Sequence, residues 1–365
     1  MNREELQDTG LFLLERTKRL MCQWATGTGK SNVAVKFMKK HPDVKCLIVV
    51  PEQDNIQNWL NEFAKFKVPA DNVTVTCYAS FKKYENTSWG LLVFDEAPHA
   101  DTEKRKAIAA TVKAEYVLAL GAKIDEEEEQ ALKDNYGEFY KTTVLLEDAV
   151  RWGILPKPTV VICHMQLNDT DRAYQYNGHK FTAKELYDYH AKTVEACVNQ
   201  YNEKPNAVTR QRMFQAGIKR KRMLGSMKEK AIREICARLN EKNRRFLCFC
   251  SSVKQAEAIG GKNAFTSKTP KSMKLLDKFN NHEINSLYVV GKLIEGQNLT
   301  DIECGVIGQL GGTERIAIQS IGRIMRSDSP LIYIPVFDDT KDDAFLFSIR
   351  DNISKDCIRH YKFNL

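Results

Sequence analysis

The fold of this chain is decided by residues 24–31, which read WATGTGKS and lie between a mostly apolar run and a helical pattern. A bound triphosphate needs backbone N–H donors at close range, the positive end of a helix, a lysine near the outer phosphates and a hydroxyl for Mg²⁺. Gly27, Gly29, Lys30 and Ser31 provide the loop backbone, the charge and the hydroxyl, just before the helical pattern begins. The stretch therefore predicts a phosphate-binding loop between a strand and a helix.

The match to the phosphate-loop pattern is imperfect at one position. The strict pattern has a glycine six residues before the lysine, and this chain has Trp24 there. The flanks support the interpretation, because Arg19–Cys22 has the character of a short strand and Asn32–Lys40 has helical periodicity. The alternative is a glycine-threonine loop that carries Lys-Ser by chance, since short motifs recur by accident.

Length and composition limit the number of domains, the class of protein and the kind of partner. The chain has 365 residues and a mass of 41.8 kDa, more than one core usually contains, so we expect two domains. With 43% hydrophobic and 28% charged residues, the composition is that of a globular protein. The formal net charge of +8 is compatible with a polyanionic partner and does not prove one.

The cysteines and the N-terminus indicate the compartment. The ten cysteines lie mostly in apolar runs without a C-x-x-C pair, which predicts buried, reduced thiols and neither a disulfide framework nor a zinc site. The apolar cluster Leu11–Leu14 is too short for a secretion signal or a membrane span. We therefore expect a soluble, cytoplasmic protein with no membrane association.

Strand and helix patterns alternate in the first half. A helix is expected over Met1–Lys18, and it carries Gln7, whose amide can read both the donor and the acceptor of an adenine edge or can simply be solvated. Strands are expected at Cys46–Val50, Val73–Cys77 and Tyr116–Leu120. The acidic run at residues 125–129 suits the start of a helix, where negative charge is favourable.

A further strand, Leu91–Phe94, ends in Asp95 and Glu96, 65 residues after Lys30. Two carboxylates at a strand end are what the other half of a nucleotide site requires, because one holds Mg²⁺ and the other acts on the attacking water. An acidic pair in this position can also be an ordinary turn. The upstream phosphate loop favours the catalytic interpretation.

The second half repeats the alternation after a proline-rich crossing, so we expect domains over residues 1–157 and 158–365. A strand is expected at Thr159–Met165, followed by a polar, helix-patterned stretch over about 169–240. Strands and helices then alternate to residue 336, and a last helix is expected over 342–361. The fold class is α/β, with two parallel-sheet lobes and a helical basic segment entering the second lobe.

The second half has no phosphate loop, but residues 319–326 read QSIGRIMR on a predicted helix. Arg323 and Arg326 share one face, and Gln319 lies one turn earlier on the same side. Two guanidinium groups can neutralise charge that develops on a phosphate held by the other lobe. Taken alone, the segment is better explained as a solvated helix face, because such charge pairs are common.

Positive charge is concentrated in residues 204–245, which contain fourteen basic and three acidic residues, a net charge of +11 that exceeds the +8 of the whole chain. Such a field favours phosphate binding, although a solvated helix face is the usual explanation of a charge run. The densest part of this stretch is a run of four consecutive basic residues, which cannot all face one side of a helix: Lys219, Arg220, Lys221 and Arg222.

The order of these pieces resembles the superfamily 2 helicases, from Gln7 to about Val336. The phosphate loop resembles motif I of that superfamily, and the other motifs match in order: Leu47–Pro51 with Asn58 and Trp59 (Ia), Tyr78–Phe81 (Ib), Asp95 and Glu96 (II), Phe246–Ser252 (IV), Glu295–Leu299 (V) and Gln319–Arg326 (VI). Within the superfamily the chain is most similar to the restriction-motor, phage and DNA-repair branch.

The resemblance implies two RecA-like lobes, ATP with Mg²⁺ as cofactor, and specific roles for individual residues. Nucleotide binding is implied for Gln7, Thr26, Gly27, Thr28, Gly29, Lys30, Ser31, Gly296 and Asn298, and Mg²⁺ binding for Ser31 and Asp95. Catalytic roles are implied for Glu96, Gln319, Arg323 and Arg326. Contacts with the nucleic-acid backbone are implied for Pro51, Ser80 and Ser251.

Three positions depart from the family pattern. Motif II has Pro98 where the family has Asp or His, with His99 one place later. Motif III normally offers two hydroxyls, and residues 121–123, Gly-Ala-Lys, offer none. Motif V has Asn298 where many relatives have Asp. The first two departures bear on the coupling of hydrolysis to strand movement more than on hydrolysis.

The resemblance therefore implies an ATP-dependent motor, expected to be a DNA helicase or translocase acting on single-stranded or branched DNA in a bacterial or phage-infected cell. A protein partner for targeting is expected, because the chain is short. Two alternatives stay open: an RNA-directed helicase, and a nucleic-acid binding module whose motor has decayed. Stimulation of ATPase activity by DNA or by RNA separates them.

Overall fold

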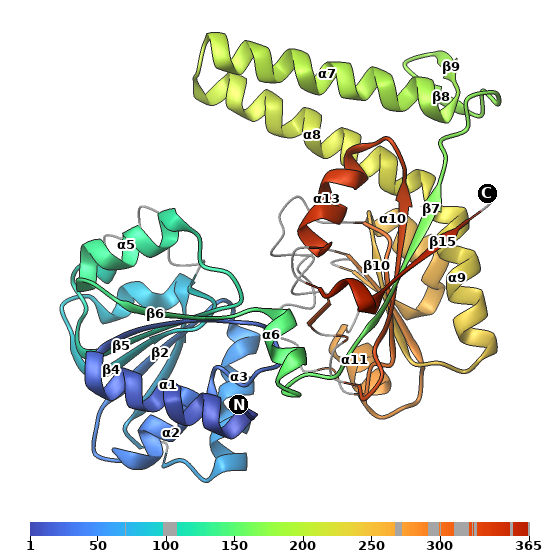
Figure 1. Cartoon of the computed structure of the whole chain (residues 1–365). Helices are drawn as coiled ribbons and strands as arrows, with labels where there is room; N and C mark the ends of the chain where they lie inside the picture. The colour runs from blue at the N-terminus through green and yellow to red at the C-terminus, as the bar shows by residue number, and fades with distance from the viewer. Residues whose placement is uncertain are drawn as a thin grey trace. The chain divides into compact units, whose positions relative to one another are not determined.

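The computed structural model describes residues 1–69, 71–97, 108–266, 272–290, 299, 301–309, 321, 322, 324, 327–350 and 353–363. The chain forms two compact units, the first built on Met1–Lys157 and the second beginning at Pro158. Each unit is an α/β structure around a parallel sheet (Figure 1). The prediction of two α/β lobes with parallel sheets is confirmed.

The first unit has a six-stranded sheet in the order β3-β2-β4-β5-β1-β6. All of its strand pairs are parallel. Its strands are β1 (Arg19–Trp24), β2 (Cys46–Val50), β3 (Val73–Cys77), β4 (Ser88–Phe94), β5 (Lys113–Gly121) and β6 (Tyr140–Val144). Strand β2 is buried along its whole length, as expected for an apolar run inside a parallel sheet covered on both faces.

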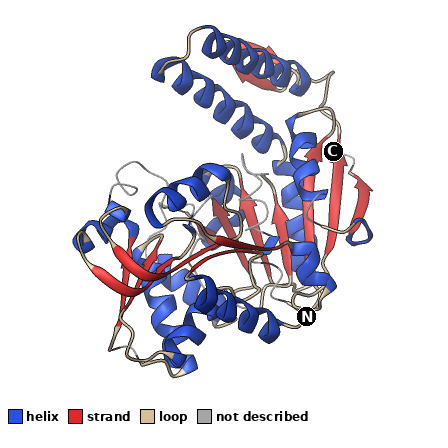
Figure 2. Ribbon diagram, turned by 60° about the vertical axis from the view of Figure 1, so that its left-hand side comes forward, coloured by secondary structure: helices blue, strands red, loops and turns tan. Residues whose placement is uncertain are grey.

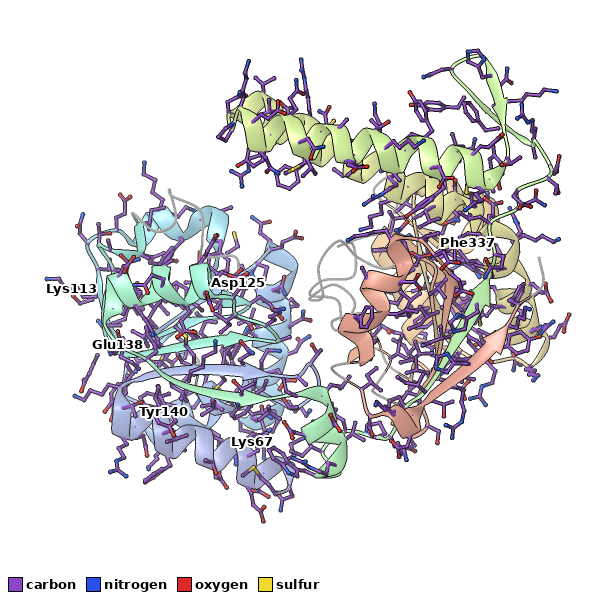
Figure 3. The ribbon with its side chains drawn as sticks, turned by 45° about the horizontal axis from the view of Figure 1, so that its top comes forward. Lys67, Lys113, Asp125, Glu138, Tyr140 and Phe337 are labelled. Carbon is purple, nitrogen blue, oxygen red and sulfur yellow. The ribbon has the colours of Figure 1, made fainter. Side chains whose placement is uncertain are left out.

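Helices cover both faces of this sheet (Figure 1). They are α1 (Arg3–Thr17), α2 (Asn32–Lys40), α3 (Gln53–Phe66), the 3-10 helix η1 (Tyr78–Tyr84), α5 (Glu126–Tyr136) and α6 (Leu146–Arg151). Phe81, Phe94 and Leu132 belong to the core on the side of α5 and η1. Asp125 caps α5, accepting from the Glu128 N–H, so the acidic run opens a helix as predicted (Figure 3).

The second unit has a seven-stranded sheet in the order β11-β12-β10-β13-β14-β7-β15, again with parallel pairs throughout. Its strands are β7 (Thr159–Met165), β10 (Phe246–Cys250), β11 (Ala264–Phe265), β12 (Ser286–Val290), β13 (Cys304–Ile307), β14 (Leu331–Phe337) and β15 (Ile358–Lys362). Its sheet-covering helices include α9 (Glu229–Glu241), α10 (Val253–Gly260), α11 (Ser272–Asn280) and α13 (Lys341–Arg350), with short 3-10 turns η3 (Gly261–Asn263) and η5 (Lys355–Cys357).

Between β7 and α9 the chain forms a projection that we call the arm, consisting of α7 (Ala183–Glu203) and α8 (Ala207–Met227). The two helices pack side by side and extend away from the seven-stranded sheet (Figure 2). Asn206 is the N-cap of α8, because its side-chain oxygen accepts hydrogen bonds from the backbone N–H groups of Val208 and Thr209. The arm is thus a helical hairpin with a well-capped tip.

The prediction of one helix-patterned stretch from residue 169 was wrong at its start. Strands β8 (Tyr174–Tyr176) and β9 (His179–Phe181) form an antiparallel hairpin beside α7 instead (Figure 2). Asn177 and Gly178 both have positive φ, 47° and 81°, as a two-residue hairpin turn requires. The Asn-Gly pair is the local signal that the periodicity argument overlooked.

The prediction of a last helix to residue 361 was also wrong. Helix α13 ends at Arg350, and Ile358–Lys362 returns as the edge strand β15 beside β7. Only Ile358 of this strand is buried, so its five residues carry little periodicity of their own. Pairing with β7 decides their conformation, since strand formation depends strongly on neighbours.

Two further expectations concern the thiols and membranes. All ten cysteines are free, and nine of them are buried, so the prediction of buried thiols is confirmed. Within the described part of the chain, no helix is long and apolar enough to cross a membrane. No group of three or more His, Cys, Asp or Glu side chains with metal-binding geometry occurs among those same residues.

Candidate nucleotide-binding site

The predicted phosphate loop lies between the end of β1 and the start of α2, at the carboxyl edge of the six-stranded sheet. Gly27 and Gly29 have φ of +92° and +82°, a backbone region that residues with side chains rarely adopt. Thr28 is fully buried, and its hydroxyl donates to the Ala25 carbonyl at 2.8 Å. The positive φ angles of the two glycines and the Thr28 hydrogen bond therefore set the course of the loop backbone.

Trp24 explains the departure from the strict glycine pattern. It is the last residue of β1, 1% exposed, and its indole N–H donates to the Thr142 hydroxyl on β6 at 2.9 Å. A Cβ built on Gly10 of α1 would lie 2.9 Å from the Trp24 ring. Trp24 thus belongs to the core between α1 and the sheet, and the loop begins after it.

Gln7 reaches this loop from α1. Its side chain is 5% exposed, which rules out the solvated alternative. Its amide nitrogen lies 3.3 Å from the Gly29 carbonyl oxygen and 3.5 Å from that of Thr28. A Cβ on Gly29 would lie 2.3 Å from that same nitrogen, so Gly29 is needed for the close approach of Gln7 as well as for its φ.

Lys30, Asp95 and Glu96 come together at the carboxyl ends of β1 and β4, which flank β5 in the sheet. Lys30 Nζ lies 4.0 Å from Glu96 Oε1, and their side chains are 12% and 25% exposed. Ser31 precedes α2, and its hydroxyl does not cap the helix. The fold therefore gathers a cation, two carboxylates and a hydroxyl from positions 65 residues apart.

Asp95 occupies a desolvated position. Burial is the largest cause that raises the pKa of Asp95 to about 6, and the neighbouring Glu96 carboxylate adds to it, while Lys30 and a hydrogen bond from Trp59 act in the opposite direction. Trp59 Nε1 donates to Asp95 Oδ2 at 2.8 Å. The Asp95 carboxylate is thus held by the Trp59 indole and by the Glu96 backbone N–H.

Glu96 has a positive φ of 50°, which is uncommon for a residue with a long side chain. The backbone is held on the strand side, where the Asp95 N–H donates to the Val49 carbonyl at 2.9 Å and the Tyr78 hydroxyl donates to the Asp95 carbonyl at 3.2 Å. Residues kept in sparsely populated conformations cluster at functional sites. The turn thus carries the Glu96 carboxylate, which lies 4.0 Å from Lys30 Nζ.

The loop has the features of a ligand cradle. Thr26 Oγ1 and Asn32 Oδ1 are buried polar atoms that lack a hydrogen-bond partner among the described residues. Buried polar atoms are nearly always paired, so this pair of atoms fits a bound polar group. Gly322, which groups with the first unit, lies against the same loop, since a Cβ added to it would lie 2.6 Å from Thr26 Cβ.

Several predicted site residues lie outside the described residues. They are Gly296, Asn298, Gln319, Arg323 and Arg326, together with Pro98 and His99 after the acidic pair. Their roles stay predictions.

The three backbone-contact candidates lie in different settings. Pro51 directly follows β2 and is half-buried. Ser80 lies in η1, where its hydroxyl is 3.5 Å from the Cys77 thiol. Ser251 follows β10 in the second unit, and its hydroxyl donates to the Gln255 amide oxygen at 2.9 Å.

The basic cluster at residues 219–222 lies on α8 of the arm, and its members differ in exposure. Lys219 and Arg222 are exposed. Arg220 and Lys221 are half-buried, and burial lowers the pKa of Lys221. The expectation that four consecutive charges point to different sides of a helix is confirmed.

Two members of the wider basic stretch are not available to a polyanion. Lys228 is fully buried, with Nζ 2.7 Å from Asp342 Oδ2. Arg245 is 5% exposed, and its guanidinium lies 3.7 Å from the centre of the Phe279 ring. The net charge of the stretch therefore overstates its accessible positive charge.

Sequence reasoning missed two residues at this site. Trp59 was noted only as part of motif Ia, although its indole holds Asp95, and Asn32 directly follows the loop. Trp59 lies four residues before Phe63, both are buried on α3, and a buried indole N–H needs an acceptor. The need of the Trp59 indole for a hydrogen-bond acceptor was therefore the sequence signal for this contact.

Two comparisons with known proteins found similarities to this chain. Residues 2–126 match the family model described as the res subunit of type III restriction enzymes, a family of superfamily 2 helicases. The crystal structure of the Hef helicase domain of Pyrococcus furiosus is similar in fold, with 14% identity and a TM-score of 0.53, covering 95% of this chain and 97% of that chain. No curated protein matches. The family match supports the resemblance to the superfamily 2 helicases over residues 2–126, and the structural match shows a shared fold.

Proposed function

We propose that this chain is an ATP-dependent, helicase-type motor that acts on nucleic acid, with DNA favoured over RNA. The observation that carries the proposal is the convergence of Lys30, Asp95 and Glu96 around the phosphate loop. A structural loop has no need for two partly buried carboxylates beside a lysine, because buried charges cost free energy unless they are paired or used.

The loop and its neighbours would hold the nucleotide. The N–H groups around Gly27 and Gly29 and the start of α2 suit phosphate oxygens, and Lys30 neutralises the outer phosphates. Ser31 and Asp95 offer the oxygen ligands that Mg²⁺ prefers. Bound Mg²⁺ would supply Lewis-acid polarisation of the phosphate oxygens.

Glu96 would act on the water that attacks the nucleotide. Its carboxylate lies 4.0 Å from Lys30 Nζ, so it is close to the outer phosphates that this lysine would contact. The carboxylate orients the water and accepts its proton as the water oxygen bonds to the γ-phosphorus, while the bond to the bridging oxygen breaks and ADP leaves. Gln319, Arg323 and Arg326 would complete the charge stabilisation, as their helical spacing suggests.

The arm is our candidate for the nucleic-acid contact. Lys219 and Arg222 are exposed on α8, and Phe214 on the same helix is 54% exposed. Arg210 lies over the Phe214 ring at 5.6 Å. Basic side chains beside an exposed aromatic ring suit a nucleic-acid strand, because the basic groups can contact phosphates and the ring offers a surface for base stacking.

The preference for DNA rests on the similarity to the restriction-enzyme family and on the motif pattern, which resembles the restriction-motor branch. The decisive experiment compares ATPase rates with single-stranded DNA, branched DNA and RNA of equal length. Stimulation by DNA with loss of turnover in Lys30→Ala supports the proposal. Stimulation by RNA alone contradicts the DNA assignment, and a parent protein without turnover contradicts the motor.

A further inference from the structure

The phosphate loop is supported by neighbouring segments, and part of this support comes from residues outside the predicted motifs. Glycine has no side chain with which to fix a loop, so the conformation of Gly27 and Gly29 depends on the atoms packed against them. Those atoms belong to helix α1 and to residues 152–155, which we call the brace. The loop, α1 and the brace all lie in the first unit.

The brace follows α6 and forms a tight turn. Gly153 has a φ of +70°, as is common for a glycine just after a helix. The N–H groups of Ile154 and Leu155 both donate to the Ala149 carbonyl in α6, at 2.9 and 3.0 Å. Ile154 and Leu155 are 5% and 4% exposed. The second half of the brace is therefore a buried turn anchored to α6.

Leu155 packs against the first of the two loop glycines. A Cβ built on Gly27 would lie 3.0 Å from Leu155 Cδ2, so the leucine fills the space where another residue would place its side chain. The Gln7 amide occupies the equivalent space beside Gly29. Each of the two glycines with positive φ therefore rests on one side chain from a neighbouring segment.

Arg3 attaches the brace to α1. Its guanidinium donates to the Ile154 carbonyl at 2.8 Å. Arg3 lies one turn before Gln7, so the two side chains leave the same face of α1. This helix face therefore holds the loop in two ways, directly through Gln7 and indirectly through Arg3 and the brace.

Helix α1 is itself fixed to α2, the helix that begins where the loop ends. Asp8 on α1 pairs with Lys36 on α2 at 2.5 Å. The two helices also pack closely at Gly10, because a Cβ built there would lie 2.8 Å from Val33 of α2. These contacts give α1 a fixed position from which Arg3 holds the brace.

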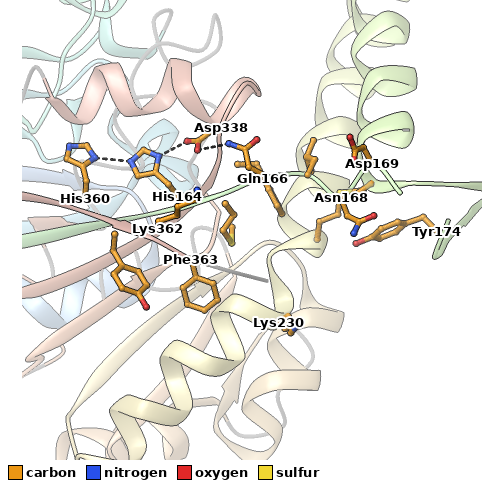
Figure 4. A pocket seen from close by; sticks show the side chains of 16 residues that line it. His164, Gln166, Asn168, Asp169, Tyr174, Lys230, Asp338, His360, Lys362 and Phe363 are labelled. Carbon is orange, nitrogen blue, oxygen red and sulfur yellow. Dashed lines mark hydrogen bonds and ion pairs between the residues drawn. The ribbon is translucent and has the colours of Figure 1, made fainter. Parts of the chain in front are cut away.

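The second unit holds the carboxyl ends of three strands by another means. Asp338 Oδ1, after β14, lies 2.5 Å from His164 Nδ1 on β7, and His164 Nε2 lies 2.8 Å from His360 Nδ1 on β15 (Figure 4). These side chains border a pocket of about 940 Å³ and link the strands directly. Glycines cannot make such links, so the loop after β1 depends on contacts from α1 and the brace.

We propose that Leu155 and Arg3 are positioning residues of the nucleotide site, because they hold the phosphate loop in the conformation that binds phosphate. This inference rests on the proposed function, since it requires that the loop binds a nucleotide. A loop that is ordered before binding loses less conformational entropy when the ligand binds. Support of this kind acts on the ground state and the transition state alike, so it lowers KM with little effect on kcat.

The test measures the dissociation constant of a fluorescent ATP analogue with Mg²⁺, together with kcat and KM for ATP at saturating DNA. Leu155→Ala removes the side chain that packs on Gly27 and should weaken analogue affinity by about 5- to 20-fold, the scale of one residue's backbone entropy. KM should rise by a similar factor, with little change in kcat.

Arg3→Met removes the guanidinium and keeps an unbranched side chain. Losing the hydrogen bond to Ile154 should weaken analogue affinity by about 2- to 10-fold. Arg3→Lys restores a donor and should recover part of this loss. Arg16→Met is the matched control, because it removes an exposed arginine from the other end of the same helix, and it should keep parental affinity.

Two further measurements separate support of the loop from other effects. Tripolyphosphate with Mg²⁺ carries no base, so its affinity should fall by the same factor as that of the ATP analogue in both brace variants. Leu132→Ala removes a similarly buried leucine from the core beside α5. This control should lower the melting temperature and keep parental affinity, because the cavity lies away from the loop.

Each outcome supports or overturns a stated part of the proposal. Parental affinity in Leu155→Ala or in Arg3→Met overturns the role of that residue, and ATP turnover in the parent then leaves the motor intact. An equal loss in Leu132→Ala, or a loss confined to the ATP analogue, overturns support of the loop by the brace. A parent that binds neither the analogue nor tripolyphosphate overturns the proposed function itself. If Leu155→Ala fails to fold by thermal melting, the exposed substitution Arg3→Met still decides.

Discussion

The phosphate loop and the arm use charge in opposite ways. At the loop, Lys30, Asp95 and Glu96 are partly buried and fixed by specific neighbours, such as the Trp59 indole. On the arm, Lys219 and Arg222 stand in solvent on one exposed helix. Electrostatic interactions are strong where water is excluded and weak where it is not. Single substitutions should therefore have large effects at the loop and small, additive effects on the arm.

The largest expected effect is at Glu96. Glu96→Gln should lower kcat by a factor on the order of 10³, because the amide cannot accept the proton of the attacking water. Nucleotide affinity should persist, measured with a fluorescent ATP analogue. Lys30→Ala is the comparison, since it removes charge from bound phosphates and should weaken that affinity as well. Near-parental turnover in Glu96→Gln would remove Glu96 from the mechanism.

An effect of similar size is expected at Arg323. Arg323→Ala should lower kcat by a factor on the order of 10³, the scale at which an arginine finger acts, with little change in ATP affinity. Steady-state ATPase assays at saturating DNA measure it. Arg323→Lys sharpens the result, because a lysine keeps the charge but not the two-pronged geometry. A variant that hydrolyses normally would show that this helix faces solvent.

The arm should respond more gently. Lys219→Gln with Arg222→Gln should lower the magnitude of the log–log salt slope of DNA binding by up to about 2, because each phosphate contact releases close to one counterion. The matched control is Arg233→Gln with Arg238→Gln on α9, which removes equal charge from arginines already paired with Glu229 and Glu234. ATPase at saturating DNA should survive in both. Equal slopes in the two double variants would place the footprint elsewhere.

The raised pKa of Asp95 predicts a dependence on pH. Mg²⁺ requires the ionised carboxylate, and in the free protein this group gains its proton below about pH 6. Affinity for the Mg²⁺-nucleotide complex should therefore fall by up to about tenfold per pH unit below 6. Isothermal titration between pH 5 and 8 measures it, and Asp95→Asn should bind weakly with no such dependence on pH.

The same shift has a consequence for stability, with the sign fixed by proton binding. The unfolded carboxyl titrates near 3.8 and the folded one near 6, so the folded state binds more protons between these values. Stability is therefore lost as pH rises through this window. Asp95→Asn removes the loss and should raise the free energy of unfolding at pH 8 by up to about 3 kcal/mol. An unchanged melting temperature at pH 8 would contradict the desolvated position of Asp95.

The contrast between loop and arm also explains what the sequence could predict. The loop is a local motif, since Gly27 and Gly29 require their positive φ and the next helix supplies the rest, so seven adjacent residues define it. The position of Asp95 at the edge of the sheet was predictable because Asp95 directly follows an apolar strand. The contact of Trp59 with Asp95 depends on how α3 packs, and Trp24 departs from the pattern because Gly10 leaves room for its ring.

The second unit was predicted less well than the phosphate loop, because some of its features depend on contacts between distant parts of the chain. Its strands β10, β12 and β13 are short apolar runs, and they lie in the part of the chain where strands and helices were expected to alternate. Strand β15 was not, because its conformation comes from pairing with β7. The burial of Lys228 was hidden as well, since its partner Asp342 lies 114 residues later in the chain. Charge counting treats every lysine alike, and only the fold separates a surface lysine from a buried one.

The smallest expected effect concerns Lys123, which replaces the hydroxyls of motif III. Lys123 follows β5, and β5 lies between β1 and β4 in the sheet, so strand order places this residue between the phosphate loop and the acidic pair. It is half-buried. A lysine there acts as a point charge, and a threonine would restore a short hydroxyl. Lys123→Thr should therefore change DNA unwinding several-fold while ATP hydrolysis changes by less than about twofold, if motif III couples the two steps rather than serving hydrolysis.

The matched control is Lys113→Thr at the opposite end of the same strand, where the side chain is exposed and far from the carboxyl edge (Figure 3). Unwinding of a forked duplex and ATP turnover are measured on the same preparation. Equal changes in both activities would assign Lys123 to the hydrolytic site, and no change in either would show that this position carries no coupling.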